Sequence, residues 1–108
     1  MPVLCRQSTS AVEIMAFAYD NGQVCFFNSY TAETYLCDAA NRTERLSAKR
    51  KAYVDSLTTM ERLGHWESDL EKIQLTKEDV EIVDLQWDPN EPNILVSFVD
   101  GSLSLISY

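Results

Sequence analysis

The residues that could act as nucleophiles or general bases are few and widely separated. The chain has 108 residues, a single histidine, His65, and three cysteines, Cys5, Cys25 and Cys37. A serine or cysteine triad would have to use His65, and no Gly-x-Ser-x-Gly elbow is present. Cys25 and Cys37 fall on predicted strands, not at helix N-termini, where a thiolate is favoured. We therefore predict that the chain has no catalytic residues and is not an enzyme.

Metal and cofactor sites are not indicated either. An odd number of cysteines without a Cys-x-x-Cys pair predicts free thiols, not a disulfide framework or a zinc site. Carboxylates gather between residues 67 and 91, but the Asp-x-Asp-x-Asp-Gly pattern of a calcium loop is missing. Asp84 and Asp88 flank Trp87 at a strand end, where solvated turn residues are the usual interpretation. No Gly-rich phosphate loop occurs. We expect no metal ion and no cofactor.

A basic cluster is the sharpest chemical feature of the chain. It lies in a predicted helix and consists of Arg42, Arg45, Lys49, Arg50 and Lys51. Arg42, Arg45 and Lys49 recur at helical spacing and would share one face. The simpler interpretation is a solvated helix face. The functional one is a docking surface for an acidic partner, either a protein, a tubulin-like surface, RNA or an anionic lipid, bound with strong salt dependence.

Composition narrows the class of protein that could carry this cluster. The formal net charge is −8, which argues against a general nucleic-acid binder with a net basic face. No apolar run approaches the ~20 residues that span a bilayer. The first residues, Met1-Pro-Val-Leu-Cys-Arg6, lack the basic and long apolar regions of a signal peptide. We expect a cytoplasmic protein.

Two β-meanders would position these side chains. The second covers residues 80–107 and contains three β-rich runs, separated by Asp88-Pro-Asn-Glu-Pro-Asn93 and by Asp100-Gly101. Asp-Gly is a strong signal for a hairpin, because glycine adopts the positive φ of a tight reversal. The first meander has strands at residues 12–19, 23–28 and 34–37, with a turn at Asp20-Asn21-Gly22. Residues 1–10 carry little pattern.

The two meanders align with each other without a gap. Residues 15–22 lie over residues 94–101, and residues 23–28 lie over residues 102–107. Self-similarity of a strand–turn–strand unit is typical of a repeat architecture. Continuous apolar runs such as Val24 to Phe27 predict that both faces of each sheet are covered, as they are between neighbouring propeller blades.

The segment between the repeats is predicted to be helical. Asn41 and Glu44 form a capping-box pattern, and no proline or glycine interrupts residues 42–63. An apolar stripe recurs at helical spacing and consists of Leu46, Tyr53, Leu57 and Met60. Gly64 is placed to end this helix. A second capping-box pattern, Ser68-x-x-Glu71, predicts the start of a short helical turn.

The second meander resembles a WD-repeat propeller blade. In that family, a strand with a tryptophan two residues before a proline precedes a strand of small and apolar residues, an Asp-Gly turn and a strand that often ends in Trp-Asp. The same order occurs in Val83 to Pro89, Ile94 to Val99, Asp100-Gly101 and Ser102 to Ser107. The first meander resembles the last three strands of a blade. Phe27-Asn28 and Ile106-Ser107 stand in the place of Trp-Asp. The pattern is also similar to large WD-repeat proteins of the intraflagellar-transport type, which leaves a ciliary or cytoskeletal location open.

The resemblance implies a mainly β fold in which a helix joins two partial antiparallel propeller blades. The chain would form one partial WD-repeat unit over residues 1–108, with a first partial blade at 11–37, a helical insertion at 41–75 and a second partial blade at 80–107. The first blade would lack an innermost strand and the second an outermost strand. Both sheets would therefore carry unpaired edges and uncovered faces, which invite pairing with other chains.

The function implied is a non-catalytic protein-interaction scaffold, a fragment or subunit of a propeller within a larger assembly. Its partners would be other protein chains or the remainder of a longer propeller. The alternative is a small homo-oligomeric β protein completed by strand exchange, without a propeller.

Overall fold

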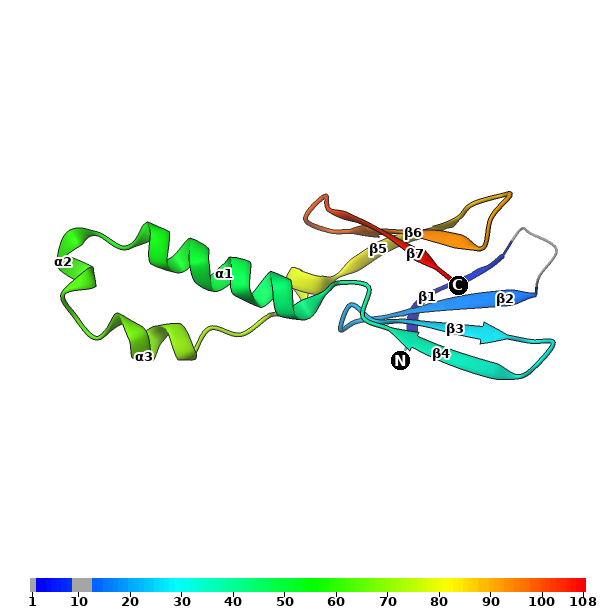
Figure 1. The fold of residues 1–108 in the computed structure, drawn as a ribbon, viewed down its shortest axis with the longest axis horizontal. Coiled ribbons are helices and arrows are strands. Elements are labelled where there is room, and N and C mark those ends of the chain that lie inside the picture. Colours follow the sequence, from blue (N-terminus) through cyan, green and yellow to red (C-terminus); the bar gives the residue numbers. More distant parts are fainter. Residues whose placement is uncertain (1, 9–12) are drawn as a thin grey trace.

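The fold is mainly β, with a helical insertion that projects from one end of two facing sheets (Figure 1). The computed structural model describes residues 2–8 and 13–108. The molecule is elongated, with principal extents of 60 × 22 × 18 Å, because the insertion continues in the direction of the strands. The prediction of antiparallel sheets joined by a helical insertion is confirmed.

The first sheet has four antiparallel strands in sequence order: β1 (Pro2–Gln7), β2 (Ile14–Tyr19), β3 (Val24–Asn28) and β4 (Glu33–Cys37). Alternate residues of β2 and β3 are fully buried, as expected for a sheet with one face on a core. Gly22 makes the reversal between β2 and β3 at a φ of 81°. The predicted strands of the first meander are confirmed, although residues 11 and 12 lie outside the described residues.

Strand β1 corrects the expectation that the first sheet lacks an innermost strand. It pairs antiparallel with β2, with Cys5 opposite Phe17 and Gln7 opposite Met15. Most β1 residues are exposed and show no regular alternation of apolar and polar side chains. The strand forms because its backbone pairs with β2, and no periodic sequence signal reveals such an edge strand.

The second sheet confirms the predicted meander. Its strands follow one another in order: β5 (Ile82–Trp87), β6 (Asn93–Phe98) and β7 (Leu103–Ser107). The Asp88 carboxylate accepts a hydrogen bond from the Asn90 backbone N–H at 2.8 Å and stabilises the turn after β5. Gly101 makes the second reversal at a φ of 88°.

The core lies between the two sheets. The Phe26 ring from β3 meets the Trp87 ring from β5 edge to face, with the ring centroids 5.8 Å apart. The Trp87 indole N–H donates to the Arg6 carbonyl oxygen at 3.1 Å and joins β5 to β1. Each sheet buries one face here, and within the described residues the other face of each sheet is not covered by another sheet. Apolar side chains also occupy the outward faces, which explains the continuous apolar runs.

The helical insertion consists of α1 (Arg42–Ser56), α2 (Thr59–Arg62) and α3 (Trp66–Glu71), followed by the short 3₁₀-helix η1 (Glu78–Val80). None of the three α-helices contains a buried residue. Figure 1 shows α1 leading away from the sheets and α3 leading back beside it. Tyr53 and Leu57 of the predicted apolar stripe line a hollow with Trp66 of the returning segment.

The insertion differs from prediction in how its helices begin and end. The single helix expected over residues 42–63 breaks at Leu57, because Thr58 and Glu61 form a capping box that starts α2. Asn41 adopts a left-handed conformation with a φ of 51° and makes no side-chain cap. Asp38 accepts the Arg42 backbone N–H instead. Helix α3 begins before the predicted Ser68 pattern, at Trp66.

Candidate interaction surfaces

Arg45 of the basic cluster points toward the second sheet. Its guanidinium forms an ion pair with Asp100 at 2.8 Å and lies 4.4 Å above the centre of the Phe98 ring. It also donates to the carbonyl oxygens of Ala40 and Asp79, at 2.6 and 3.1 Å. Only 19% of its side chain is exposed. Arg45 therefore connects the first turn of α1 to both ends of the insertion and to the β6–β7 turn.

Lys49 and Arg50 also bond within the chain. The Lys49 ammonium lies 2.6 Å from the Asp79 carboxylate. That hydrogen bond is the main reason why the pKa of Asp79 is held below its usual value, and the Thr76 backbone N–H adds to the effect. The Arg50 guanidinium donates to the Ile73 carbonyl oxygen at 3.4 Å. These side chains hold α1 against the returning segment.

Most members of the predicted docking cluster are therefore engaged in bonds within the chain. Arg45, Lys49 and Arg50 face the chain itself, and Arg42 pairs with Asp38 at 3.5 Å at the start of α1. Lys51 is exposed. The proposed acidic partner stays a prediction, and Lys51 is the member of the cluster that could reach it without a change in the internal bonds.

Asp100 stabilises its own hairpin, as the Asp-Gly pattern predicts. Its carboxylate accepts hydrogen bonds from the Ser102 hydroxyl at 2.6 Å and from the Ser102 backbone N–H at 2.9 Å. These bonds, together with Arg45, hold the pKa of Asp100 at about 2. The Asp100 carboxylate therefore stabilises the β6–β7 turn and also binds Arg45 of α1.

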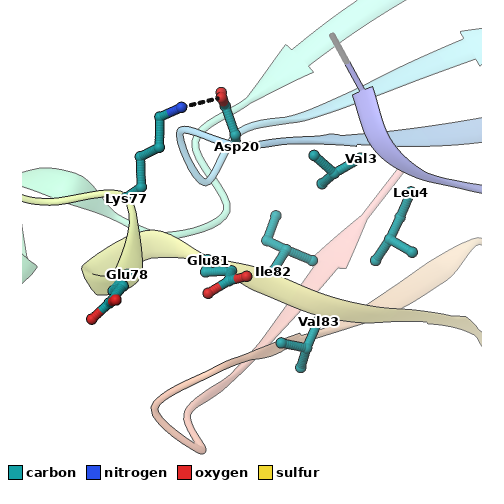
Figure 2. A pocket seen from close by; sticks show the side chains of 8 residues that line it. All are labelled: Val3, Leu4, Asp20, Lys77, Glu78, Glu81, Ile82 and Val83. Atoms are coloured by element: carbon teal, nitrogen blue, oxygen red, sulfur yellow. Dashed lines mark ion pairs between the residues drawn. The ribbon is translucent and has the colours of Figure 1, made fainter.

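A pocket of about 350 Å³ lies where β1 and β5 begin (Figure 2). Figure 2 shows Val3 and Leu4 of β1 on the same side of β5 as Ile82, whereas the Val83 side chain points to the other side of the β5 ribbon. At its edge Lys77 pairs with Asp20 at 3.2 Å, and its remaining lining residues are Glu78 and Glu81. No histidine or cysteine lines it. The pocket offers an apolar surface and carboxylates, but no nucleophile beside a base.

The histidine and the cysteines lie on different elements. His65 precedes α3 in the insertion, whereas Cys25 and Cys37 lie in β3 and β4. The three cysteines are free thiols, and burial raises the pKa of the Cys37 thiol, with a further contribution from Asp38. Over residues 2–8 and 13–108, no group of three or more histidine, cysteine or acidic side chains could hold a metal ion.

The first sheet presents an apolar outward face. The strand register places Cys5, Phe17, Cys25 and Leu36 in one row across all four strands. A neighbouring row contains Met15 opposite Phe27. Most of these side chains are half-buried by their neighbours within the sheet, and Leu36 is 55% exposed. We call this surface the first open face.

The second sheet presents an apolar surface on its far side over β6 and β7, and β5 adds Asp84 and Gln86 in the same rows. Leu95 of β6 lies opposite Leu105 of β7, and Leu103 lies beside them. Leu103 and Leu105 are 64% and 66% exposed. A hollow of about 420 Å³ on this side is lined by Leu95, Leu105 and residues of the β5–β6 turn. We call this surface the second open face.

The sequence predicts an uncovered face on each sheet but does not assign residues to it, although a signal for these residues is present. Alternate positions of the aligned repeats carry apolar side chains on each side of the strand. This pattern predicts which residues share a face, but it does not show which face is covered within the chain.

Comparisons with protein-family models, with curated proteins and with solved structures found no match. In the part of the chain that the structure describes, no helix is long and apolar enough to cross a membrane.

Proposed function

We propose that this chain is a non-catalytic protein-interaction scaffold that contributes two blades of the WD-repeat type to a larger propeller assembly. The observation that supports this function is the pair of open faces. Exposed leucines side by side on a regular sheet, as on the second open face, are typical of a surface that another protein covers. The resemblance of residues 83–107 to a WD-repeat blade supports the proposal that this assembly is a propeller.

A second candidate function is a small homo-oligomeric β protein completed by strand exchange, without a propeller. One observation favours it. In the described residues β7 pairs only with β6, whereas the corresponding β3 pairs on both sides, with β2 and β4. The outer edge of β7 therefore offers backbone groups to a further strand.

The same proposal places the protein in the cytoplasm. All three cysteines are free, and Cys5 is exposed. Exposed free thiols persist in a reducing compartment. A ciliary or cytoskeletal association would follow from the narrower resemblance and depends on the partner.

The proposed function is tested by affinity capture from an extract of the source cells with matched variants. Leu105→Lys places a charge on the second open face, and Tyr30→Lys changes an exposed turn residue, 89% accessible, away from it. We expect wild type and Tyr30→Lys to retain the same proteins and Leu105→Lys to lose most of them. An unchanged set of bound proteins with Leu105→Lys, and with Leu36→Lys on the first open face, would contradict the proposal.

A further inference from the structure

The two sheets are copies of one unit at the level of hydrogen-bond register. The sequence alignment places Met15 over Ile94 and Phe27 over Ile106. In the structure, Met15 pairs with Phe27 and Ile94 pairs with Ile106. The aligned glycines, Gly22 and Gly101, both adopt a positive φ in the turn that follows. Equivalent positions can therefore be compared side chain by side chain.

The contact between the sheets uses opposite faces of this repeated unit. The first sheet buries Ala16, Ala18, Val24 and Phe26, each 0% exposed. The equivalent positions of the second sheet are Leu95, Ser97, Leu103 and Leu105, which form its second open face. The second sheet buries Ile94, Val96, Phe98 and Ile106, whose equivalents Met15, Phe17, Tyr19 and Phe27 point to the first open face.

The packing is therefore head-to-tail and not two-fold symmetric. A two-fold sandwich would bury the same face of both units, whereas here each unit buries the face that the other leaves open. Heterologous contacts of this kind can be repeated indefinitely, and they form a ring if the rotation closes and a filament if it does not. The contact between the two sheets of one chain can therefore be repeated between two chains.

We propose that the occupant of the second open face is the first open face of another copy of this chain. The proposal rests on the proposed function and names the partner of its interaction surface. This occupant follows from continuity with the contact already present between the two sheets. Within the chain, the face of the first sheet that carries Phe26 packs on the face of the second sheet that carries Ile94 and Ile106. The second open face is equivalent to the first of these faces, and the first open face is equivalent to the second. Leu103 and Leu105 of one copy would meet Phe17 and Phe27 of the next.

The position of the insertion permits this docking. Figure 1 shows the helices extending in the direction of the strands, beyond the end of the sheets, and not across either outward face. Repeated docking would therefore place every insertion on the same side of the assembly. Closed propellers have about four to eight blades, so a ring of two-sheet chains would hold roughly two to four copies.

The test is the mass of the whole chain and two variants by sedimentation equilibrium. At about 0.15 M salt, where charges are screened beyond ~8 Å, we expect wild type to form a discrete assembly of roughly two to four copies, each of 12.3 kDa. Leu105→Lys and Phe17→Lys should each be monomeric alone. An equimolar mixture of the two should form a one-to-one dimer, because each variant keeps the face that the other has lost.

Control variants distinguish loss of the interface from loss of the fold. Tyr30→Lys should assemble like wild type, and circular dichroism with thermal melting should show that the monomeric variants remain folded. If Phe17→Lys unfolds, Leu36→Lys at 55% exposure takes its place on the same face. Monomeric wild type, assembly of either variant alone, or a mixture that stays monomeric would overturn the proposal. Monomeric wild type that still captures other proteins through Leu105 would leave the proposed function intact.

Discussion

Gly22 and Gly101 lie in equivalent turns of the two sheets but differ in what surrounds them. A Cβ atom at Gly22 would lie 2.5 Å from the Ala40 Cβ and 2.9 Å from the Val80 Cβ. A Cβ atom at Gly101 would meet nothing within 4 Å. Both residues have a positive φ, so an alanine at either position carries the same backbone strain. Only Gly22 adds a steric conflict with the two ends of the insertion.

We therefore predict that Gly22→Ala destabilises the protein more than Gly101→Ala. Left-handed strain costs about 1–2 kcal/mol at either position, and overpacking at Gly22 adds roughly 1–3 kcal/mol. Urea unfolding of both variants measures the difference in the free energy of unfolding. Equal destabilisation would mean that Gly22 does not contact Ala40 and Val80.

The lowered pKa of Asp100 predicts how the free energy of unfolding changes in acid. Its pKa is held at about 2, below the ordinary value of 3.8, by the Ser102 hydroxyl first, then by the Ser102 N–H and Arg45. Since the folded pKa is the lower one, the ionised carboxylate stabilises the fold at and above neutral pH. That contribution is lost as the pH falls from about 4 to about 2.

Carboxyl carbon NMR titration measures this pKa directly. We expect Ser102→Ala to raise the pKa of Asp100 toward 3.8, because the largest stabilising contact of the carboxylate is removed. Asn21→Ala, in the equivalent turn of the first sheet, serves as the control and should leave the titration of Asp100 unchanged. A wild-type titration near 3.8 would show that the hydrogen bonds to Ser102 are not formed.

At the scale of elements, helix α1 is held to the sheets by polar contacts and not by a core, whereas the ends of the insertion, at Ala40 and Val80, are buried. Helix α1 has no buried residue, and Arg45 makes the contacts that connect it to Ala40, Asp79 and Asp100. Such a helix depends on few interactions. Removal of the guanidinium should therefore release α1 without unfolding the sheets.

We predict that Arg45→Met accelerates amide hydrogen exchange in α1 by at least about tenfold, because hydrogen bonds to charged groups contribute about 1.5–3 kcal/mol each. Lys51→Met, at an exposed position of the same helix, should leave the exchange rates unchanged. Exchange in β2 and β6 reports whether the sheets remain intact. Equal rates in both variants would contradict the role of Arg45 as an anchor.

The elements that could be predicted from the sequence are those with a local signal. Gly22 and Gly101 fix two hairpins by turn chemistry, and the strands around them follow. Strand β1 has no such signal, because its exposed residues form a strand only through pairing with β2. The break at Leu57 depends on competition between helix continuation and the Thr58 capping box. The open faces required the three-dimensional packing, since apolar residues on both sides of a strand do not show which side is covered.

At the scale of the whole molecule, the arrangement of the sheets carries the functional account. Two copies of one unit bury opposite faces against each other and leave the complementary pair open. A domain that buried the same face of both units would not leave a complementary pair of faces open. The basic cluster, the pocket between β1 and β5 and the free thiols are secondary to this arrangement.

The native cysteines allow the most direct test of the central claim that the open faces are covered by one another. Cys5 and Cys25 lie on the first open face, in the row that contains Phe17. Cys37 shares the buried face, opposite Val24, and serves as the internal reference. The measurement is the alkylation rate of each thiol, resolved by peptide mass spectrometry, as a function of protein concentration. We predict that Cys5 and Cys25 slow together by more than about tenfold as the concentration rises, while Leu105→Lys keeps the fast rates of the dilute protein. Rates that do not change with concentration, or that slow equally in Leu105→Lys, would contradict the account.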